Sequence, residues 1–143
     1  MSREQEFLNA AKAGDQGTFI RILNNQSMKI DPNRTNIDGD TALILAVRRG
    51  YIDIVSALLA DERVDPNCND QGNRALIWAA CRGFIDIVRF MLADKRIDPN
   101  HADKYGRTAL IDAAFHGHGD IVNMLLADER IDPNHSDCLL YTS

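Results

Sequence analysis

The densest group of potential metal ligands in the chain lies at 112–120. It contains Asp112, His116, His118 and Asp120, and imidazole and carboxylate groups are common zinc ligands. However, His118 stands in a Gly-His-Gly step of the kind that joins two helices, and no HExxH spacing is present. We therefore interpret these residues as parts of a turn and of helix ends, and predict no metal site here.

A second possible ligand set consists of Cys68, His101 and His135, which follow one another at steps of 33 and 34 residues. Equal steps suggest one position in successive stacked units. Stacked helices lie about 8–10 Å apart, whereas zinc holds its ligands at about 2.0–2.3 Å. This set cannot close around one ion, so we predict no metal and no other cofactor.

Motifs for phosphate binding and catalysis are also missing. The glycine-containing segments 14–17 and 117–119 match neither GxxxxGK[ST] nor GxGxxG. Asp-Glu-Arg or Asp-Lys-Arg occurs at 61–63, 94–96 and 128–130, and we interpret these runs as solvated helix ends. The aspartates that precede proline are interpreted as turn formers: Asp31, Asp65, Asp98 and Asp132. With no catalytic constellation found, we expect that the protein is not an enzyme.

Composition narrows the class without defining the function. The 143 residues are 45% hydrophobic and 26% charged, with a net charge of −5 that argues against a nucleic-acid partner. We find no apolar stretch long enough to cross a bilayer and no apolar signal-peptide core after Met1. The three cysteines, Cys68, Cys81 and Cys138, have no disulfide-type spacing. We expect a cytoplasmic or nuclear protein.

An internal repeat organises almost the whole chain. Ile30-Asp31-Pro32-Asn33 returns in near-identical form at 64–67, 97–100 and 131–134, with the aspartates 34, 33 and 34 residues apart. Further positions keep the same step: Gly39, Gly72 and Gly106; Ala46, Ala79 and Ala113; Gly50, Gly83 and Gly117. A fixed period of this length is the mark of a repeat architecture.

The residues of one unit predict two helices and a loop. Thr41 is a capping-type residue before an apolar stretch at helical spacing, and Gly50 permits a left-handed turn at its end. Asp53 then begins a second helix, in which Ile54, Val55, Leu58 and Leu59 form one apolar face. Asn36 to Gly39 make a further turn. Because such a unit cannot bury its apolar face alone, neighbouring units must stack.

The segments Thr41–Ala46 and Thr108–Ala113 resemble the T-P-L-H-x-A signature of ankyrin repeats, and the resemblance extends over residues 1–134. It implies an all-α ankyrin-repeat solenoid of stacked helix-turn-helix units joined by hairpin-like loops. The signature proline is replaced by Ala42, Ala75 and Ala109, and the signature histidine by Ile44, Ile77 and Ile111. Arg74 stands where the capping threonine is expected, which predicts a weaker helix start in that repeat.

We expect one domain over 1–137, with repeats at approximately 2–33, 34–67, 68–100 and 101–134. The first resembles a capping repeat, with Ser2 and Gln5 as a capping box and Phe7, Leu8 and Phe19 facing inward. Residues 138–143 match no ankyrin position and correspond to a translated sequencing-adapter end. We therefore expect a non-native tail and a natural protein that continues with more repeats.

In ankyrin-like arrays, the loops and first helices form the concave binding surface. The positions there that differ between the repeats are the candidate partner-binding residues: Ile37, Asp38, Asp40, Leu45, Arg48 and Arg49; Asp70, Gln71, Asn73, Trp78, Cys81 and Arg82; Lys104, Tyr105, Arg107, Asp112, Phe115 and His116. Aromatic residues and arginine are enriched at binding hot spots. Trp78 is either an anchor for a partner's side chain, flanked by Tyr105 and Phe115, or a half-buried residue that seals the groove.

The resulting hypothesis is a monomeric protein–protein interaction module. We expect a protein partner and no nucleic-acid, membrane or small-molecule ligand. Two alternatives remain open at this point. In the first alternative, the chain is the recognition arm of a larger enzyme such as a kinase or ubiquitin ligase. In the second, it is a structural spacer that binds nothing.

Overall fold

A computed structural model describes residues 2–25, 27, 29–67 and 71–131, with the side chains of 71–73 excepted. This part of the chain contains eight α-helices and no strand, in agreement with the all-α prediction. Their bounds are α1 Arg3–Ala13, α2 Gln16–Asn24, α3 Ala42–Arg49, α4 Ile52–Ala60, α5 Gln71–Arg82, α6 Ile85–Ala93, α7 Ala109–Phe115 and α8 Gly119–Ala127.

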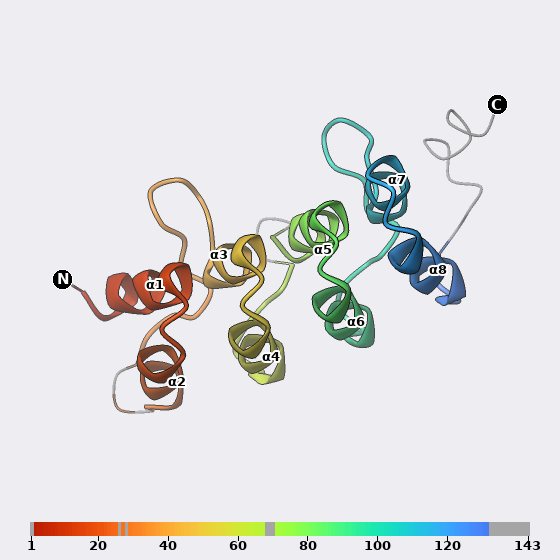
Figure 1. The fold of residues 1–143 in the computed structure, drawn as a ribbon. Helices are drawn as coiled ribbons and strands as arrows, with labels where there is room; N and C mark the ends of the chain where they lie inside the picture. Colours follow the sequence, from red (N-terminus) through yellow and green to blue (C-terminus); the bar gives the residue numbers. More distant parts are fainter. Residues whose placement is uncertain (1, 26, 28, 68–70, 132–143) are drawn as a thin grey trace. The chain divides into compact units, whose positions relative to one another are not determined.

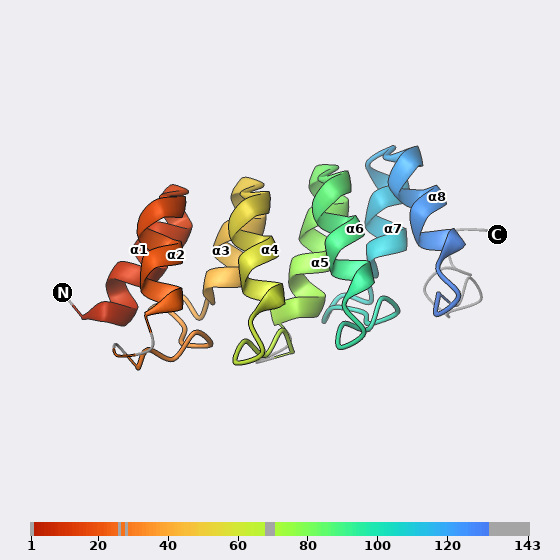
Figure 2. The ribbon, with the colours of Figure 1, turned by 90° about the horizontal axis from the view of Figure 1, so that it is seen from below.

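The chain forms two compact units, Met1–Gly72 and Asn73–Ser143. In the first unit α1 packs against α2 and α3, while α4 packs against α2 and α3. In the second unit α8 packs against α6 and α7. Within each unit the first helices of the hairpins form one layer and the second helices form another (Figure 1). The long loops of a unit lie at one end of its helices, opposite the short turns inside the hairpins (Figure 2).

The predicted caps begin three of the first helices. The hydroxyl oxygens of Ser2, Thr41 and Thr108 accept hydrogen bonds from the backbone N–H groups of Gln5, Ile44 and Ile111, at 3.1, 3.4 and 3.2 Å. Each bond satisfies one amide that the helix itself cannot pair. The capping box at Ser2 is half formed, because the Gln5 side-chain amide donates to Oδ1 of Asn9 instead.

The prediction of a weakened helix start at Arg74 was wrong. Helix α5 begins at Gln71, so Arg74 lies within the helix rather than at its first turn. Arginine lacks the short side-chain oxygen with which Thr41 and Thr108 stop and cap their helices, and it has a high helix propensity. The helix therefore extends toward the N-terminus by four residues beyond Ala75, the position that corresponds to the first residues of α3 and α7.

The turn inside each hairpin is closed by the backbone. Gly50 has a φ of 75°, and the N–H of the following Tyr51 donates to the carbonyl of Ala46. His118 donates in the same way to the carbonyl of Ala113. This six-to-one bond with a left-handed residue inside it satisfies the carbonyls at the helix end. The predicted left-handed turn at Gly50 is therefore confirmed.

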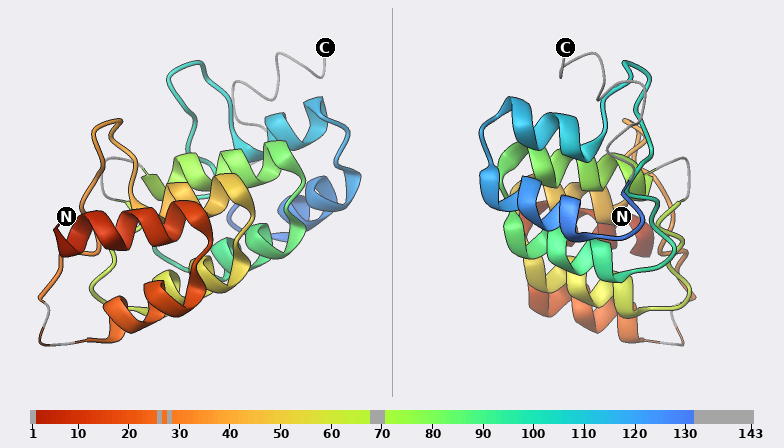
Figure 3. Two further views of the ribbon diagram at one scale, coloured as in Figure 1. Left: turned by 60° about the vertical axis from the view of Figure 1, so that its left-hand side comes forward. Right: turned by 90° about the vertical axis from the view of Figure 1, so that its right-hand side faces the viewer.

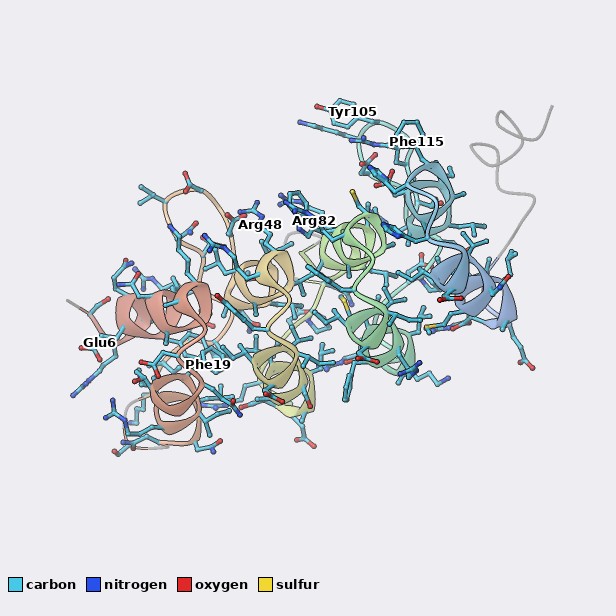
Figure 4. The ribbon with its side chains drawn as sticks, viewed as in Figure 1. Glu6, Phe19, Arg48, Arg82, Tyr105 and Phe115 are labelled. Atoms are coloured by element: carbon cyan, nitrogen blue, oxygen red, sulfur yellow. The ribbon has the colours of Figure 1, made fainter. Side chains whose placement is uncertain are left out.

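Apolar packing fills the space between the helices of each unit. Ile44, Ile77 and Ile111, which replace the signature histidine, are all buried. In the first hairpin Phe7 and Phe19 stack with ring centroids 4.5 Å apart, and Phe19 lies between α1 and α2 (Figure 4). Ile54, Val55 and Leu58 are buried as predicted, whereas Leu59 is half-buried.

The interpretation of the Asp-x-Arg runs as solvated helix ends was wrong for Arg63 and Arg130. Asp128 accepts hydrogen bonds from Arg130 at 2.8 and 3.0 Å, and the same guanidinium donates to the carbonyls of Leu92 and Ile97 at 2.6 and 3.0 Å. Arg63 reaches the carbonyl of Leu23 in the same manner, at 2.6 Å. The arginine thereby satisfies backbone carbonyls at the end of the preceding helical hairpin.

The asparagine of the Asp-Pro-Asn motif makes a second link between hairpins. The Asn33 side chain donates to the Arg63 carbonyl at 2.9 Å and accepts from the Asp65 N–H at 2.6 Å. The Asn100 side chain donates to the Arg130 carbonyl. The aspartates form the predicted turns, since Asp31, Asp65 and Asp98 each accept from the N–H two residues later.

Candidate functional site

Two loop tips of equal backbone geometry project beyond the first helices, at 36–40 in the first unit and at 103–107 in the second (Figure 3). Asn36 Oδ1 accepts from the N–H groups of Asp38 and Asp40 at 2.9 and 3.0 Å. Asp103 Oδ1 accepts from the N–H groups of Tyr105 and Arg107 at 2.8 and 2.9 Å.

A pair of backbone bonds closes each tip in addition. Asn36 donates to the Asp40 carbonyl, and the Asn36 carbonyl accepts from Gly39; Asp103 and Gly106 repeat this arrangement with Arg107. Gly39 and Gly106 have φ values of 82° and 78°, which favour glycine. Both tips are therefore pre-formed, and they differ in the side chains that they present.

The tip of the first unit presents an apolar side chain beside a fixed ion pair. Ile37 is fully exposed and Asp38 is exposed. Asp40 is only 3% exposed, and it accepts two hydrogen bonds from the guanidinium of Arg48, at 2.7 and 3.2 Å. Arg48 is half-buried and its neighbour Arg49 is exposed. The two-point pair orients the Arg48 guanidinium at the base of the tip.

The tip of the second unit presents an aromatic ring between two cations. Tyr105 is 68% exposed, with Lys104 Nζ 5.1 Å and the Arg107 guanidinium carbon 5.0 Å from its ring centroid. Arg107 also pairs with Asp103 at 3.3 Å. Cations at these distances are attracted to the face of a ring. Tyr105 is thus held outward within a positively charged frame.

The first helices of the second unit end in further aromatic and cationic groups. Phe115, the last residue of α7, is 78% exposed, and its ring meets the ring of His116 edge-on at 5.1 Å. Arg82, the last residue of α5, is exposed and lies 5.2 Å above the ring of Trp78. Trp78 itself is half-buried. Tyr105 and Phe115 both extend outward on the same side of this unit (Figure 4).

Cys81 and His116 lie in contact without forming an activated pair. Cys81 Sγ is 3.6 Å from His116 Nε2, and His116 Nδ1 is 2.9 Å from the carbonyl oxygen of Asp112. Because a carbonyl only accepts, Nδ1 carries the proton and donates it. Burial raises the pKa of the Cys81 thiol, and the nearby Asp112 raises it further. A raised pKa keeps the thiol protonated, which opposes a nucleophilic role.

Three residues of the predicted partner-binding set are buried. Asp40, Leu45 and Asp112 are 3%, 6% and 6% exposed, so they cannot offer their side chains directly to a partner. The prediction that Leu45 and Asp112 belong to the contact surface was therefore wrong for their side chains. Asp40 is covered because Arg48 binds it, and Asp112 lies within electrostatic reach of Arg107, Asp103 and His116.

The remaining predicted residues divide by exposure. Trp78, Arg48 and Cys81 are half-buried, and for Trp78 this agrees with the second of the two alternatives in its degree of burial. Asp70 and the side chains of Gln71 and Asn73 lie outside the described residues, as do Cys68, His135 and the tail at 138–143. Nine of the predicted partner-binding residues are exposed in the described structure: Ile37, Asp38, Arg49, Arg82, Lys104, Tyr105, Arg107, Phe115 and His116.

The segment 112–120 does not assemble as a metal site in the described structure. His118 Nε2 is 2.9 Å from the carbonyl oxygen of Cys81, so this nitrogen is engaged in a hydrogen bond between two hairpins. Within the described ranges, no three His, Cys, Asp or Glu side chains are grouped so that they could hold a metal ion. The helices described include none whose length and hydropathy would allow it to span a bilayer.

Sequence reasoning missed the residues that link one hairpin to the next. The sequence pattern predicted solvated charge for the runs that contain Arg63 and Arg130 and a turn at His118, and it predicted no contact for Asn33. A signal was present, because Arg63, Arg96 and Arg130 and the asparagine of each Asp-Pro-Asn keep one position in every period. A charge that repeats with the scaffold has a structural role, whereas a partner-binding residue is free to differ.

Comparison with known proteins agrees with the periodicity and the helical hairpins. A family model described as ankyrin repeats (3 copies) matches residues 7–103 and 62–137. No curated protein matches the chain. Since the matched residues extend over most of the sequence, and the described helices form the hairpins that the repeat requires, the chain belongs to the ankyrin-repeat family.

Proposed function

We propose that this chain is a non-catalytic protein-binding module whose contact surface consists of the exposed side chains of the tips and of the first-helix ends. Ankyrin repeats generally act in protein–protein interaction. The finer proposal, which residues make the contact, rests on the side chains that the described structure leaves exposed.

The observation that carries the proposal is the pair of exposed rings in the second unit. Tyr105 and Phe115 are 68% and 78% exposed, although large aromatic side chains favour burial. Tyr105 stands on a tip closed by four hydrogen bonds from and to Asp103. A pre-formed surface loses little conformational entropy when a partner binds, so exposed rings on it can contribute strongly to affinity.

Affinity purification with matched variants tests the proposal. The intact chain and a Tyr105→Ser/Phe115→Ser variant are used as baits, and captured proteins are identified and quantified by mass spectrometry. We expect at least one protein that the unchanged chain captures and that the variant captures at least about tenfold less, because loss of two hot-spot rings typically costs more than about 1.4 kcal/mol.

The second unit offers a control of the same kind. Phe90 on α6 and Leu126 on α8 are also exposed, at 45% and 50%, but they stand on second helices. The Phe90→Ser/Leu126→Ser variant should capture the same protein as the unchanged chain. Equal loss in both variants would show general stickiness of apolar surface, and undiminished capture by the Tyr105/Phe115 variant would reject this surface.

A further inference from the structure

One part of the candidate surface has a charge opposite to that of the chain as a whole. We name the group formed by Arg82, Lys104, Tyr105, Arg107 and Phe115 the basic–aromatic surface. All of its members are exposed and belong to the second unit. The whole chain has a net charge of −5. A local excess of cations on an acidic protein creates a site that attracts anions at short range.

The tip and the helix ends that make up this surface lie around a common residue, Cys81. Arg107 on the tip and Arg82 at the end of α5 are both near enough to Cys81 to oppose the rise in the pKa of its thiol. Cys81 in turn touches His116, whose ring packs edge-on against Phe115. The tip and the ends of α5 and α7 therefore lie near one another, around Cys81 and His116.

The carboxylates of this region leave the cations largely unneutralised. Asp103 is engaged with Arg107 and with the backbone of the tip. Asp112 is buried, at 6% exposed, so its carboxyl group is not presented at the surface beside Arg82 and Lys104. Lys104 and Arg82 instead lie against the rings of Tyr105 and Trp78. A ring leaves the charge of a cation intact, so these two groups remain available to an anion.

We propose that the basic–aromatic surface binds an acidic peptide segment that carries at least one apolar side chain. The inference rests on the proposed function and adds the chemistry of the partner. Carboxylates of the segment pair with Arg82 and Lys104, and its apolar side chain packs against Tyr105 and Phe115. A nucleic acid is disfavoured because the net charge of −5 repels a phosphate backbone over a longer range.

Selection from a library tests the chemistry without knowledge of the natural partner. Short random peptides are displayed on bacteria and selected for binding to the intact 143-residue chain. We expect the enriched peptides to combine Asp or Glu with Leu, Ile, Phe or Trp. The affinity of an enriched peptide is then measured by fluorescence anisotropy, and it should fall as salt is raised, because screening weakens exposed charge pairs.

Matched variants assign the binding to this surface. Arg82→Glu/Lys104→Glu should weaken binding of the selected peptide at least about tenfold. The conservative variant Arg82→Lys/Lys104→Arg should keep most of the affinity. Arg89→Glu/Lys95→Glu makes the same change in net charge on α6 and at its end, at two exposed positions, and should leave binding within about twofold. Thermal unfolding of each variant confirms that the fold is retained.

The outcomes separate this inference from the proposed function. Enriched peptides without acidic residues, or equal binding by the charge-reversed variant, overturn the inference while protein binding stands. Displacement of the peptide by an equimolar single-stranded oligonucleotide overturns it in favour of nucleic acid. Failure to enrich any peptide also overturns it, and the affinity purification with Tyr105 and Phe115 variants then decides the proposed function alone.

Discussion

The imidazole of His118 lies directly against Gly83, and its Nε2 donates a hydrogen bond to the carbonyl oxygen of Cys81 at 2.9 Å. A Cβ on Gly83 would stand 2.8 Å from the Cε1 atom of this ring. The first unit repeats the arrangement, since a Cβ on Gly14 would stand 2.7 Å from Tyr51. Within each unit, the ring that begins one second helix thus rests on the glycine turn of the preceding hairpin.

Replacement of Gly83 by alanine should destabilise the protein more than replacement of Gly117. Both glycines have positive φ values, 81° and 75°, so each alanine suffers backbone strain of about 1 kcal/mol. At Gly117 nothing lies within 4 Å of an added Cβ, whereas at Gly83 it meets His118, which adds about 1–3 kcal/mol. Urea unfolding measures both; equal losses would contradict the packing of His118 against Gly83.

His118→Phe isolates the hydrogen bond from the ring contact. Phe84 occupies the corresponding N-cap position of α6, so a phenyl ring suits the backbone there. The variant leaves the Cys81 carbonyl without its imidazole donor, which should cost about 1 kcal/mol of unfolding free energy. Chemical denaturation provides the measurement. A variant as stable as the unchanged protein would show that the bond adds nothing beyond ring packing.

Arg130→Ala should lower the unfolding free energy by about 1.5–3 kcal/mol, because the guanidinium bonds two backbone carbonyls as well as Asp128. Arg130→Lys should recover only part of this, since an ammonium cannot reproduce the planar geometry. Arg89→Ala is the control: its pair with Asp86 is exposed and should contribute less than about 0.5 kcal/mol. Equal losses of unfolding free energy for Arg130→Ala and Arg89→Ala would show that Arg130 contributes no more than a solvated surface charge.

Asp112→Asn should stabilise the protein at neutral pH. Burial raises the pKa of Asp112, and Arg107 opposes the rise in part. The folded state therefore binds this proton more tightly than the unfolded chain, and the cost of the ionised form is relieved as pH falls through the raised pKa. The gain from Asn should vanish below about pH 4, the unfolded value. Urea unfolding over a pH series checks this, and a pH-independent effect would contradict it.

Asp128→Asn should show the opposite dependence on pH. The hydrogen bonds from Arg130 lower the pKa of Asp128 below its ordinary value. Stability from such a group is present above the unfolded pKa and is lost as pH falls through the folded one. The variant should therefore be less stable at neutral pH, with the difference closing in acid. The same pH series measures it, and Asp112→Asn serves as the contrasting control.

The sequence by itself determined the repeat, its helical hairpins and three of the helix starts. Caps at Ser2, Thr41 and Thr108, and the left-handed turn at Gly50, were predictable because each depends on residues a few positions apart in the chain. The burial of Ile54, Val55 and Leu58 follows from helical periodicity in the same way.

Only the tertiary structure decided which differing side chains remain exposed. The sequence predicted Asp40 as a surface residue, but in the fold Arg48, eight positions later, binds its carboxylate. Arg130 looked like solvated charge, yet it bonds the carbonyl of Leu92, thirty-eight positions earlier. A long side chain can reach any of several groups within its radius, and the fold sets which of them is there. The local sequence does not show which distant groups the fold brings within reach of such a side chain.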